Sequence, residues 1–124
     1  MLTDGSVRCW GHNDHGQLGN GNNATGTPGM SLLPIAVLGI TNAATIAAGA
    51  VHTCALLTDG TVQCWGDSYW GQLGSGTTTS SSVPVAVAGI TGATAIAAGS
   101  YHTCVLLTDG TIQCWGDDSL GELG

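Results

Sequence analysis

The residues with the clearest chemical potential are two pairs of cysteines, each pair ten positions apart. The pairs are Cys54 with Cys64 and Cys104 with Cys114, and each flanks a Leu-Leu-Thr-Asp-Gly-Thr segment. Such thiols could form disulfides, bind a metal or stay free. Zinc sites favour two to four residues between paired ligands, so the nine intervening residues here disfavour zinc. Disulfides and buried free thiols remain as alternatives.

The register of the hairpin between the cysteines bears on this choice. If Asp59 and Gly60 formed a two-residue turn, Cys54 would face Trp65, and the two sulfurs would lie on opposite faces of the sheet. If residues 58–60 form a three-residue loop with a left-handed glycine, Cys54 faces Cys64 at about 4.5 to 5.5 Å, within reach of a disulfide. Such a bridge would stabilise the fold by about 3 kcal/mol and would predict an extracytoplasmic location, secreted or on the cell surface.

Cys9 is the fifth cysteine, and repeat register gives it no partner in this sequence. Its partner would lie ten residues earlier, before Met1. An unpaired cysteine beside paired ones predicts that the missing strand belongs to a longer chain or comes from another chain. The preferred interpretation is a fragment of a longer chain.

Histidines give weaker indications of a site. His12, Asp14 and His15 share a short loop that could hold a metal, but the corresponding loops later in the chain lack both histidines. Polar loop residues without a ligand are therefore the better interpretation. His52 and His102 occupy one repeated position, Gly-x-x-His-Thr, which favours a structural ring bonded to a neighbouring turn.

Motifs for catalysis or cofactor binding are not found. The sequence has no Gly-x-Ser-x-Gly elbow, no Walker motif and no Gly-x-Gly-x-x-Gly unit. The aspartates that precede turn glycines favour turn formation. The aspartates in the loops after Trp-Gly lack the ligand spacing of a calcium-binding EF-hand. We therefore expect no enzyme activity, no cofactor and no metal.

Aromatic residues in variable loops are candidates for contact with a partner. Trp70 aligns with His15 and Leu120 in the other units, so its loop varies in sequence. Together with Tyr69 it would make an aromatic patch if exposed, and Tyr101 could join them. The alternative is that Trp70 covers the edge of its own sheet.

Composition and charge exclude some partners. The chain has 124 residues, 21 glycines, no phenylalanine and a formal net charge of −7, with Arg8 its one strong base. It cannot neutralise a row of phosphates, so nucleic acid and anionic membrane surfaces are disfavoured. The apolar stretch 35–57 is interrupted by polar residues and glycines, so we expect no membrane span.

Repeated motifs divide the chain into units. Leu-Thr-Asp-Gly begins at residues 2, 57 and 107, and Cys-Trp-Gly begins at residues 9, 64 and 114, so the spacings are 55 and 50. The units are 1–56, with a longer surface loop at 20–29, then 57–106, then a partial unit at 107–124. A complete unit, at about fifty residues, has the size of a four-stranded propeller blade. Within one unit we expect strands near 84–88, 95–98, 102–107 and 111–115.

Several motifs in order resemble a known family. Gly-Gln-Leu-Gly at 71–74, Val-Pro at 83–84, Ile-Ala-Ala-Gly-x-x-His-Thr at 96–103, and the Asp-Gly and Trp-Gly that follow are similar to the regulator of chromosome condensation 1 (RCC1) repeat. The resemblance covers essentially the whole chain. It implies an all-β fold of antiparallel four-stranded blades, a partial β-propeller with about two and a third blades present. The cysteine-bearing form is similar to repeats of bacterial exported proteins, in which the propeller is a binding scaffold.

The predicted function is a non-catalytic interaction scaffold that binds a protein or a glycan. One alternative is an accessory domain of a larger exported enzyme, whose chemistry would lie elsewhere. Another is a self-assembling module in which several copies close one ring. The self-assembling module would be a homo-oligomer. The scaffold and the accessory domain would each place this chain in a longer propeller.

Overall fold

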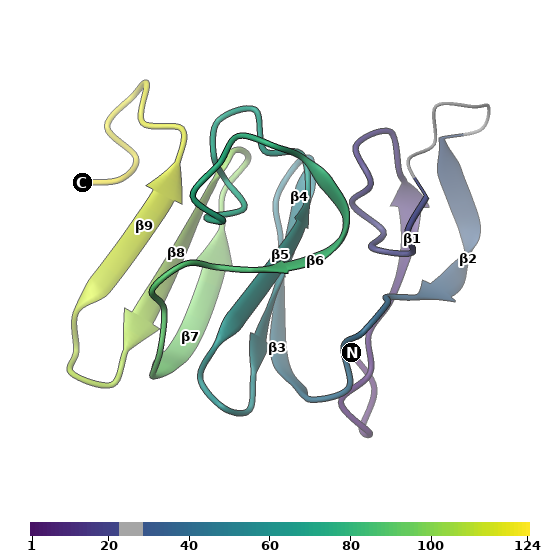
Figure 1. The fold of residues 1–124 in the computed structure, drawn as a ribbon, viewed down its shortest axis with the longest axis horizontal. Coiled ribbons are helices and arrows are strands. Elements are labelled where there is room, and N and C mark those ends of the chain that lie inside the picture. The colour runs from purple at the N-terminus through teal and green to yellow at the C-terminus, as the bar shows by residue number, and fades with distance from the viewer. Residues whose placement is uncertain (23–28) are drawn as a thin grey trace.

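The structure is a computed structural model that describes residues 1–22 and 29–124. Nine strands occur in the described residues (Figure 1). They are β1 (Arg8–His12), β2 (Met30–Ala36), β3 (Ala43–Ala48), β4 (His52–Leu57), β5 (Val62–Gly66), β6 (Ser81–Ala86), β7 (Ala93–Ala98), β8 (His102–Leu107) and β9 (Ile112–Gly116). The predicted all-β class is confirmed. No helix in the described part of the chain is long and apolar enough to cross a membrane.

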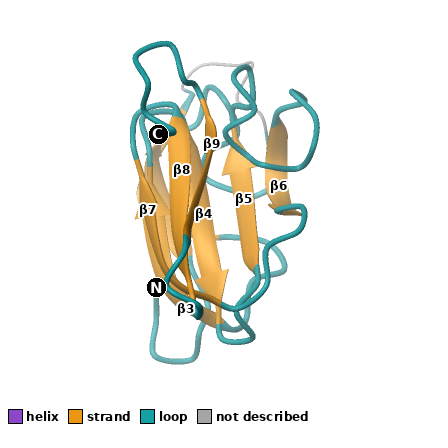
Figure 2. Cartoon of the chain, turned by 90° about the vertical axis from the view of Figure 1, so that its left-hand side faces the viewer, coloured by secondary structure: helices purple, strands orange, loops and turns teal. Residues whose placement is uncertain are grey.

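The strands form three antiparallel sheets that follow one another along the chain. Their orders are β1-β2, β3-β4-β5-β6 and β7-β8-β9. Figure 2 shows the third sheet in front of the four-stranded sheet. The complete sheet covers residues 43–86, so it starts at a different point of the repeat from the unit 57–106 counted on the sequence. That division into units stays a prediction.

Most of the expected strands lie within two residues of their observed positions. The exception is β6, which begins at Ser81, three residues before the predicted start at Pro84. Proline is tolerated there because β6 is an edge strand, where an N–H is not needed for pairing. The longer loop predicted at 20–29 falls mostly on residues 23–28, which lie outside the described residues.

A three-residue loop joins β4 to β5. Gly60 has a φ of 82°, and the Leu57 N–H donates to Thr61 O at 2.9 Å. The Asp59 carboxylate accepts from the Thr61 N–H at 3.0 Å and from its hydroxyl at 2.6 Å, and these bonds lower the pKa of Asp59. A side chain at position 60 would be strained, because a positive φ disfavours any residue with a Cβ. The loop sets the register that places Cys54 opposite Cys64.

Apolar side chains fill the two spaces between the sheets. Between the first and second sheets lie Val7, Val37, Ile40, Ala43, Ala55, Leu57 and Trp65. Between the second and third lie Cys54, Leu56, Val62, Cys64, Leu73, Val87, Ile90, Ala93 and Val105. The four-stranded sheet is therefore covered on both faces, which explains why all six residues of β4 are buried.

Candidate interaction surface

The most exposed aromatic pair lies in the loop between β5 and β6. Tyr69 is 70% exposed and Trp70 is 48% exposed. Their ring centroids are 5.0 Å apart in an edge-to-face arrangement, which is a favourable geometry for aromatic rings. Trp70 therefore does not simply cover the edge of its own sheet, and the loop presents two aromatic rings to solvent.

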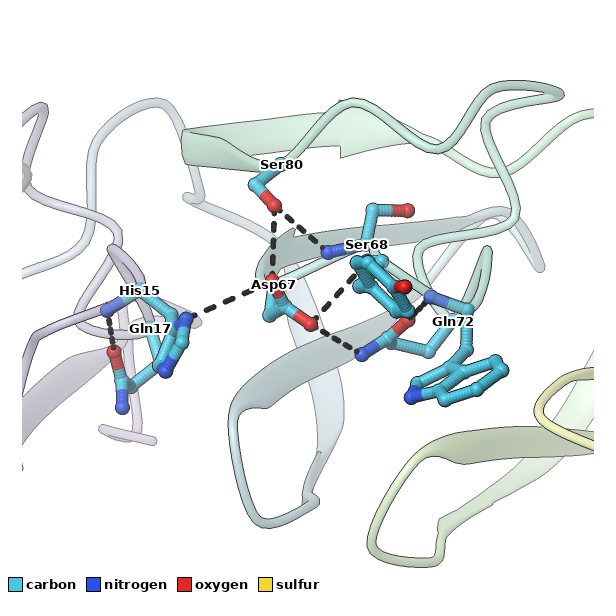
Figure 3. A network of polar contacts seen from close by, with 8 residues as sticks. His15, Gln17, Asp67, Ser68, Gln72 and Ser80 are labelled. Carbon is cyan, nitrogen blue, oxygen red and sulfur yellow. Dashed lines mark hydrogen bonds and ion pairs between the residues drawn. The ribbon is translucent and has the colours of Figure 1, made fainter.

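Two polar side chains hold this loop in shape (Figure 3). One oxygen of Asp67 accepts from the Tyr69 N–H at 3.2 Å and from Gln72 Nε2 at 3.0 Å, and the other accepts from Ser80 Oγ at 3.1 Å. Gln72 Oε1 accepts from the Trp70 N–H at 2.9 Å. The backbone of both aromatic residues is thus fixed by bonds to side chains of their own loop.

Gln72 also connects the loop to the next sheet. It is fully buried, and its main-chain carbonyl accepts from Thr103 Oγ1 at 3.1 Å and from Trp115 Nε1 at 2.9 Å. The same joint occurs one repeat earlier, where Thr53 Oγ1 and Trp65 Nε1 donate to the carbonyl of Gln17. Each joint ties a loop to the sheet that follows it.

His52 completes the joint between the second and third sheets. Its Nε2 lies 2.8 Å from Thr103 Oγ1. The Thr103 hydroxyl has one hydrogen, and it donates that hydrogen to Gln72 O. It must therefore accept a hydrogen bond from His52, which means that Nε2 carries the ring proton. Nδ1 is buried without a partner, and burial, reinforced by His102, lowers the pKa of His52 to about 4 against a smaller opposing effect of Asp67. The structural role predicted for His52 agrees with this contact, but its partner Thr103 lies in a strand of the next sheet rather than in a turn.

The other loop histidines lie beside carboxylates. His12 Nδ1 is 3.8 Å from Asp14 Oδ2, and His15 Nδ1 is 3.6 Å from Asp67 Oδ1. His15 therefore faces the aromatic loop from the first unit (Figure 3). In the part of the chain that the structure describes, no three His, Cys, Asp or Glu side chains gather to hold a metal ion.

Tyr101 lies at the same end of the sheets as the aromatic pair. Its carbonyl accepts from the Asp117 N–H, as the Val51 carbonyl accepts from the Asp67 N–H at the start of the aromatic loop. The two turns are joined by a hydrogen bond from Ala50 N to Ser100 O. Tyr101 is 43% exposed, and within the described residues the edge-to-face aromatic pair consists of Tyr69 and Trp70 without it.

The cysteines lie on neighbouring strands. Cys54 and Cys64 are joined by an S–S bond of 2.08 Å with Cα atoms 4.0 Å apart, and Cys104 and Cys114 by one of 2.04 Å with Cα atoms 4.1 Å apart. Cys9 is a free, half-buried thiol opposite Ile35, and burial raises its pKa. Of the two alternatives left open for these pairs, disulfides and free thiols, this structure contains the disulfides.

The three repeated tryptophans differ in exposure. Trp65 is fully buried and Trp115 is half-buried, as expected for packing between sheets, but Trp10 is 63% exposed. In the described residues no strand pairs with the second edge of β1, so nothing covers Trp10. Trp10 occupies the same repeat position as Trp65 and Trp115, yet in the described residues it lies open to solvent.

Sequence reasoning missed Asp67, Gln72 and Thr103 as the residues that position the aromatic loop. The recurring Gly-Gln-Leu-Gly was a usable signal, because a buried amide repeated in a loop indicates a structural contact. The partners of the Gln72 carbonyl, Thr103 and Trp115, lie 31 and 43 residues further along the chain, and only the packing of the two sheets brings them to Gln72.

Comparison with known proteins agrees with this arrangement. Two family models, both described as the Regulator of chromosome condensation (RCC1) repeat, match residues 4–56 and 59–106 and residues 43–72 and 93–122. The folded sheets and these matches define a repeat protein of the β-propeller class. The chain belongs to the RCC1 repeat family.

Individual relatives match only part of their own length. The chain is 36% identical over 75 residues to the RCC1 domain-containing protein RUG3, mitochondrial, of Arabidopsis thaliana, covering 60% of this chain and 16% of that protein. In structure it is similar to yeast RCC1 (Prp20) bound to Kap60, with a TM-score of 0.82 and 22% identity, and to human WBSCR16, with 0.80 and 24%. Both alignments cover 94% of this chain and 29% of the other, and they show the fold.

Proposed function

We propose that this chain is a non-catalytic interaction module that binds a protein or glycan partner through the loops at one end of its sheets. The carrying observation is the exposed Tyr69–Trp70 pair, whose backbone is fixed by Asp67 and the buried Gln72. Rigid aromatic side chains bind well because little conformational entropy is lost when they are covered. Tyr101, at the same end, extends the proposed surface.

Relatives support a binding role for the fold. Yeast Prp20 has been crystallised with Kap60, and the Saccharomyces cerevisiae protein is described by its binding properties to Gsp1p and histones. Because loops determine function on a shared fold, these partners are not transferred to this chain. The acidic charge of −7 favours partners that carry basic groups.

The two disulfides support a location outside the cytoplasm. Disulfides persist in oxidising compartments, and both bridges lie at equivalent positions of the repeat. The RUG3 relative is named as mitochondrial, so the compartment of this chain is part of the proposal. Alkylation of the chain in intact cells of its source, followed by mass measurement, should find Cys54, Cys64, Cys104 and Cys114 protected. Labelling of all four would contradict the proposed location.

The binding proposal is tested by removing the aromatic pair. The immobilised chain is exposed to a glycan array and, in parallel, to the secreted proteins of its source, and ligands are compared with those of the double variant Tyr69→Ser/Trp70→Ser. Loss of two such anchors should weaken a bound ligand by at least about tenfold. Leu32→Ser is the matched control, because Leu32 is 85% exposed on β2. Equal capture by wild type and double variant would contradict the proposal.

A further inference from the structure

The loop that carries Tyr69 and Trp70 lies between two loops of the same kind. Residues 13–19, 67–74 and 117–124 follow β1, β5 and β9, and Figure 1 shows all three loops at one end of the sheets. His15 of the first loop lies 3.6 Å from the Asp67 carboxylate of the second (Figure 3). Both neighbouring loops are described, so the exposure of the aromatic pair is measured with both neighbours in place.

These three loops carry carboxylates and no Lys or Arg. The carboxylates are those of Asp14, Asp67, Asp117, Asp118 and Glu122. Arg8, the one Lys or Arg of the sequence, is the first residue of β1, whereas loop 13–19 follows the last residue of that strand. No Lys or Arg side chain of this sequence is therefore available to the faces of the Tyr69 and Trp70 rings.

The faces of these two rings are attractive to cations. An aromatic ring carries negative charge density on its faces, and tryptophan binds a cation there better than the other aromatic residues do. The Tyr69 and Trp70 rings meet at 79°, edge to face, and both are exposed. A guanidinium group is flat and weakly hydrated, so it can stack on such a face as well as be attracted by it. The surface thus favours an arginine side chain.

The polar side chains beside the rings disfavour a sugar. The three hydrogen bonds that Asp67 accepts come from its own loop and the start of β6, namely from Tyr69 N, Gln72 Nε2 and Ser80 Oγ. Gln72 is fully buried. Few donors or acceptors therefore remain for sugar hydroxyls, which lose their bonds to water when they are covered. All three donors to Asp67 are neutral, so its negative charge persists and still attracts a cation.

We propose that the surface formed by Tyr69 and Trp70 binds an arginine-bearing segment of a partner protein. The guanidinium group stacks on Trp70, and the carboxylates of the three loops attract its charge. The aliphatic part of the arginine side chain lies against Tyr69, since long cationic side chains bury their stems on apolar surface. This assignment rests on the proposed function and narrows its partner from a protein or a glycan to a basic polypeptide.

The test is an NMR titration of the chain with two peptides at pH 7.5. One peptide alternates glycine and arginine, and in the other each arginine is replaced by citrulline, which has nearly the same shape without the charge. The arginine peptide should shift the indole N–H signal of Trp70 and bind at least about fivefold more tightly than the citrulline peptide. Trp10 is the internal control, because it is 63% exposed but lies two residues from Arg8, and its indole signal should stay in place.

Two substitutions of Trp70 separate its aromatic face from its apolar area. Trp70→Phe keeps an aromatic face, so it should retain part of the preference for the arginine peptide. Trp70→Leu keeps an apolar side chain without such a face, so it should bind the two peptides with equal affinity. A preference in Trp70→Leu as large as in the wild type would contradict stacking on Trp70.

The role of charge is tested by the matched variants Asp14→Asn and Asp59→Asn. Each removes one negative charge, but Asp14 lies in a loop beside the aromatic loop, whereas Asp59 lies in the turn before β5. The five residues of β5 span about 17 Å, which exceeds the screening length of about 10 Å at 0.1 M salt. In that salt Asp14→Asn should weaken the arginine peptide by at least about twofold, and Asp59→Asn should leave its affinity unchanged.

Other outcomes would overturn the assignment. Equal affinity of the wild type for the two peptides would do so and would leave the proposed function standing. The same holds if the arginine peptide at millimolar concentration leaves the Trp70 signal in place, or if the two aspartate variants have equal effects. Failure of the proposed function itself has a different sign, which is equal capture of ligands by the wild type and by Tyr69→Ser/Trp70→Ser.

Discussion

His52 Nε2 lies 2.8 Å from Thr103 Oγ1, and this contact joins the second sheet to the third. The Thr103 hydroxyl donates a hydrogen bond to the carbonyl of Gln72, so the three residues form a chain of hydrogen bonds that runs from His52 to Gln72. One set of contacts therefore fixes a strand, a neighbouring sheet and the loop that carries Tyr69 and Trp70.

The stability of the fold should fall as the pH is lowered. The folded pKa of His52 is about 4, and the unfolded value is about 6.5, so between these values the unfolded chain binds more protons. The loss begins near pH 6.5, is complete below pH 4, and reaches about 3 kcal/mol. Urea unfolding across this range measures it. His52→Gln should flatten the profile, and the exposed-site control His12→Gln should leave it as in the wild type.

Thr103→Val should destabilise the chain by about 1 to 3 kcal/mol. The substitution keeps the shape of the side chain but leaves the buried His52 N–H without an acceptor. It also leaves the Gln72 carbonyl with one donor, Trp115 Nε1, instead of two. The exposed strand residue Thr45 provides the control, and Thr45→Val should change the free energy of unfolding by less than about 0.5 kcal/mol. Equal effects of the two substitutions would contradict the proposed joint.

Gln72→Leu should release the aromatic loop while the strands stay paired. It removes the amide that bonds the Trp70 N–H and Asp67, so the Tyr69 and Trp70 amides should exchange hydrogen at least about tenfold faster. Glu122→Leu, the same repeat position in the last loop, is the control and should leave residues 67–74 unchanged. Hydrogen exchange followed by NMR resolves these amides, and unchanged protection in Gln72→Leu would refute the assignment.

Removal of the Cys54–Cys64 bridge as a double alanine variant should cost about 3 kcal/mol in the free energy of unfolding. The equivalent Cys104/Cys114 variant should lose a similar chain-entropy contribution but less packing, because the first pair is fully buried and the second is half-buried. Chemical denaturation of both variants compares them. A smaller loss of unfolding free energy in the Cys54/Cys64 variant than in the Cys104/Cys114 variant would contradict this prediction.

The local features of this fold were predictable from the sequence, and the joints between sheets were not. Thr58 to Gly60 fixes the hairpin register through residues adjacent in the chain, so the position of Cys54 opposite Cys64 follows from turn geometry. Exposure of Trp70 was left open, because it depends on how a loop folds over its sheet.

The contacts of Gln72 show what local patterns miss. Its carbonyl could be joined to Thr103 and Trp115 only once the angle between two sheets was known, since strand pairing within a sheet says nothing about the next sheet. The exposure of Trp10 could not be read from the sequence for the same reason. Its repeat position suits packing, but packing requires a neighbour that the described chain does not place there.

The joint at Gln72 uses a backbone carbonyl, and every amino acid has one. Two positions earlier in the loop, the three units carry His15, Trp70 and Leu120, which share neither charge nor shape. Substitution at that outward position leaves the carbonyl and its two donors in place. The architecture thus separates the residues that hold neighbouring sheets together from those at the exposed loop tip, so the side chains that the proposed function assigns to partner contact can change without loss of the fold.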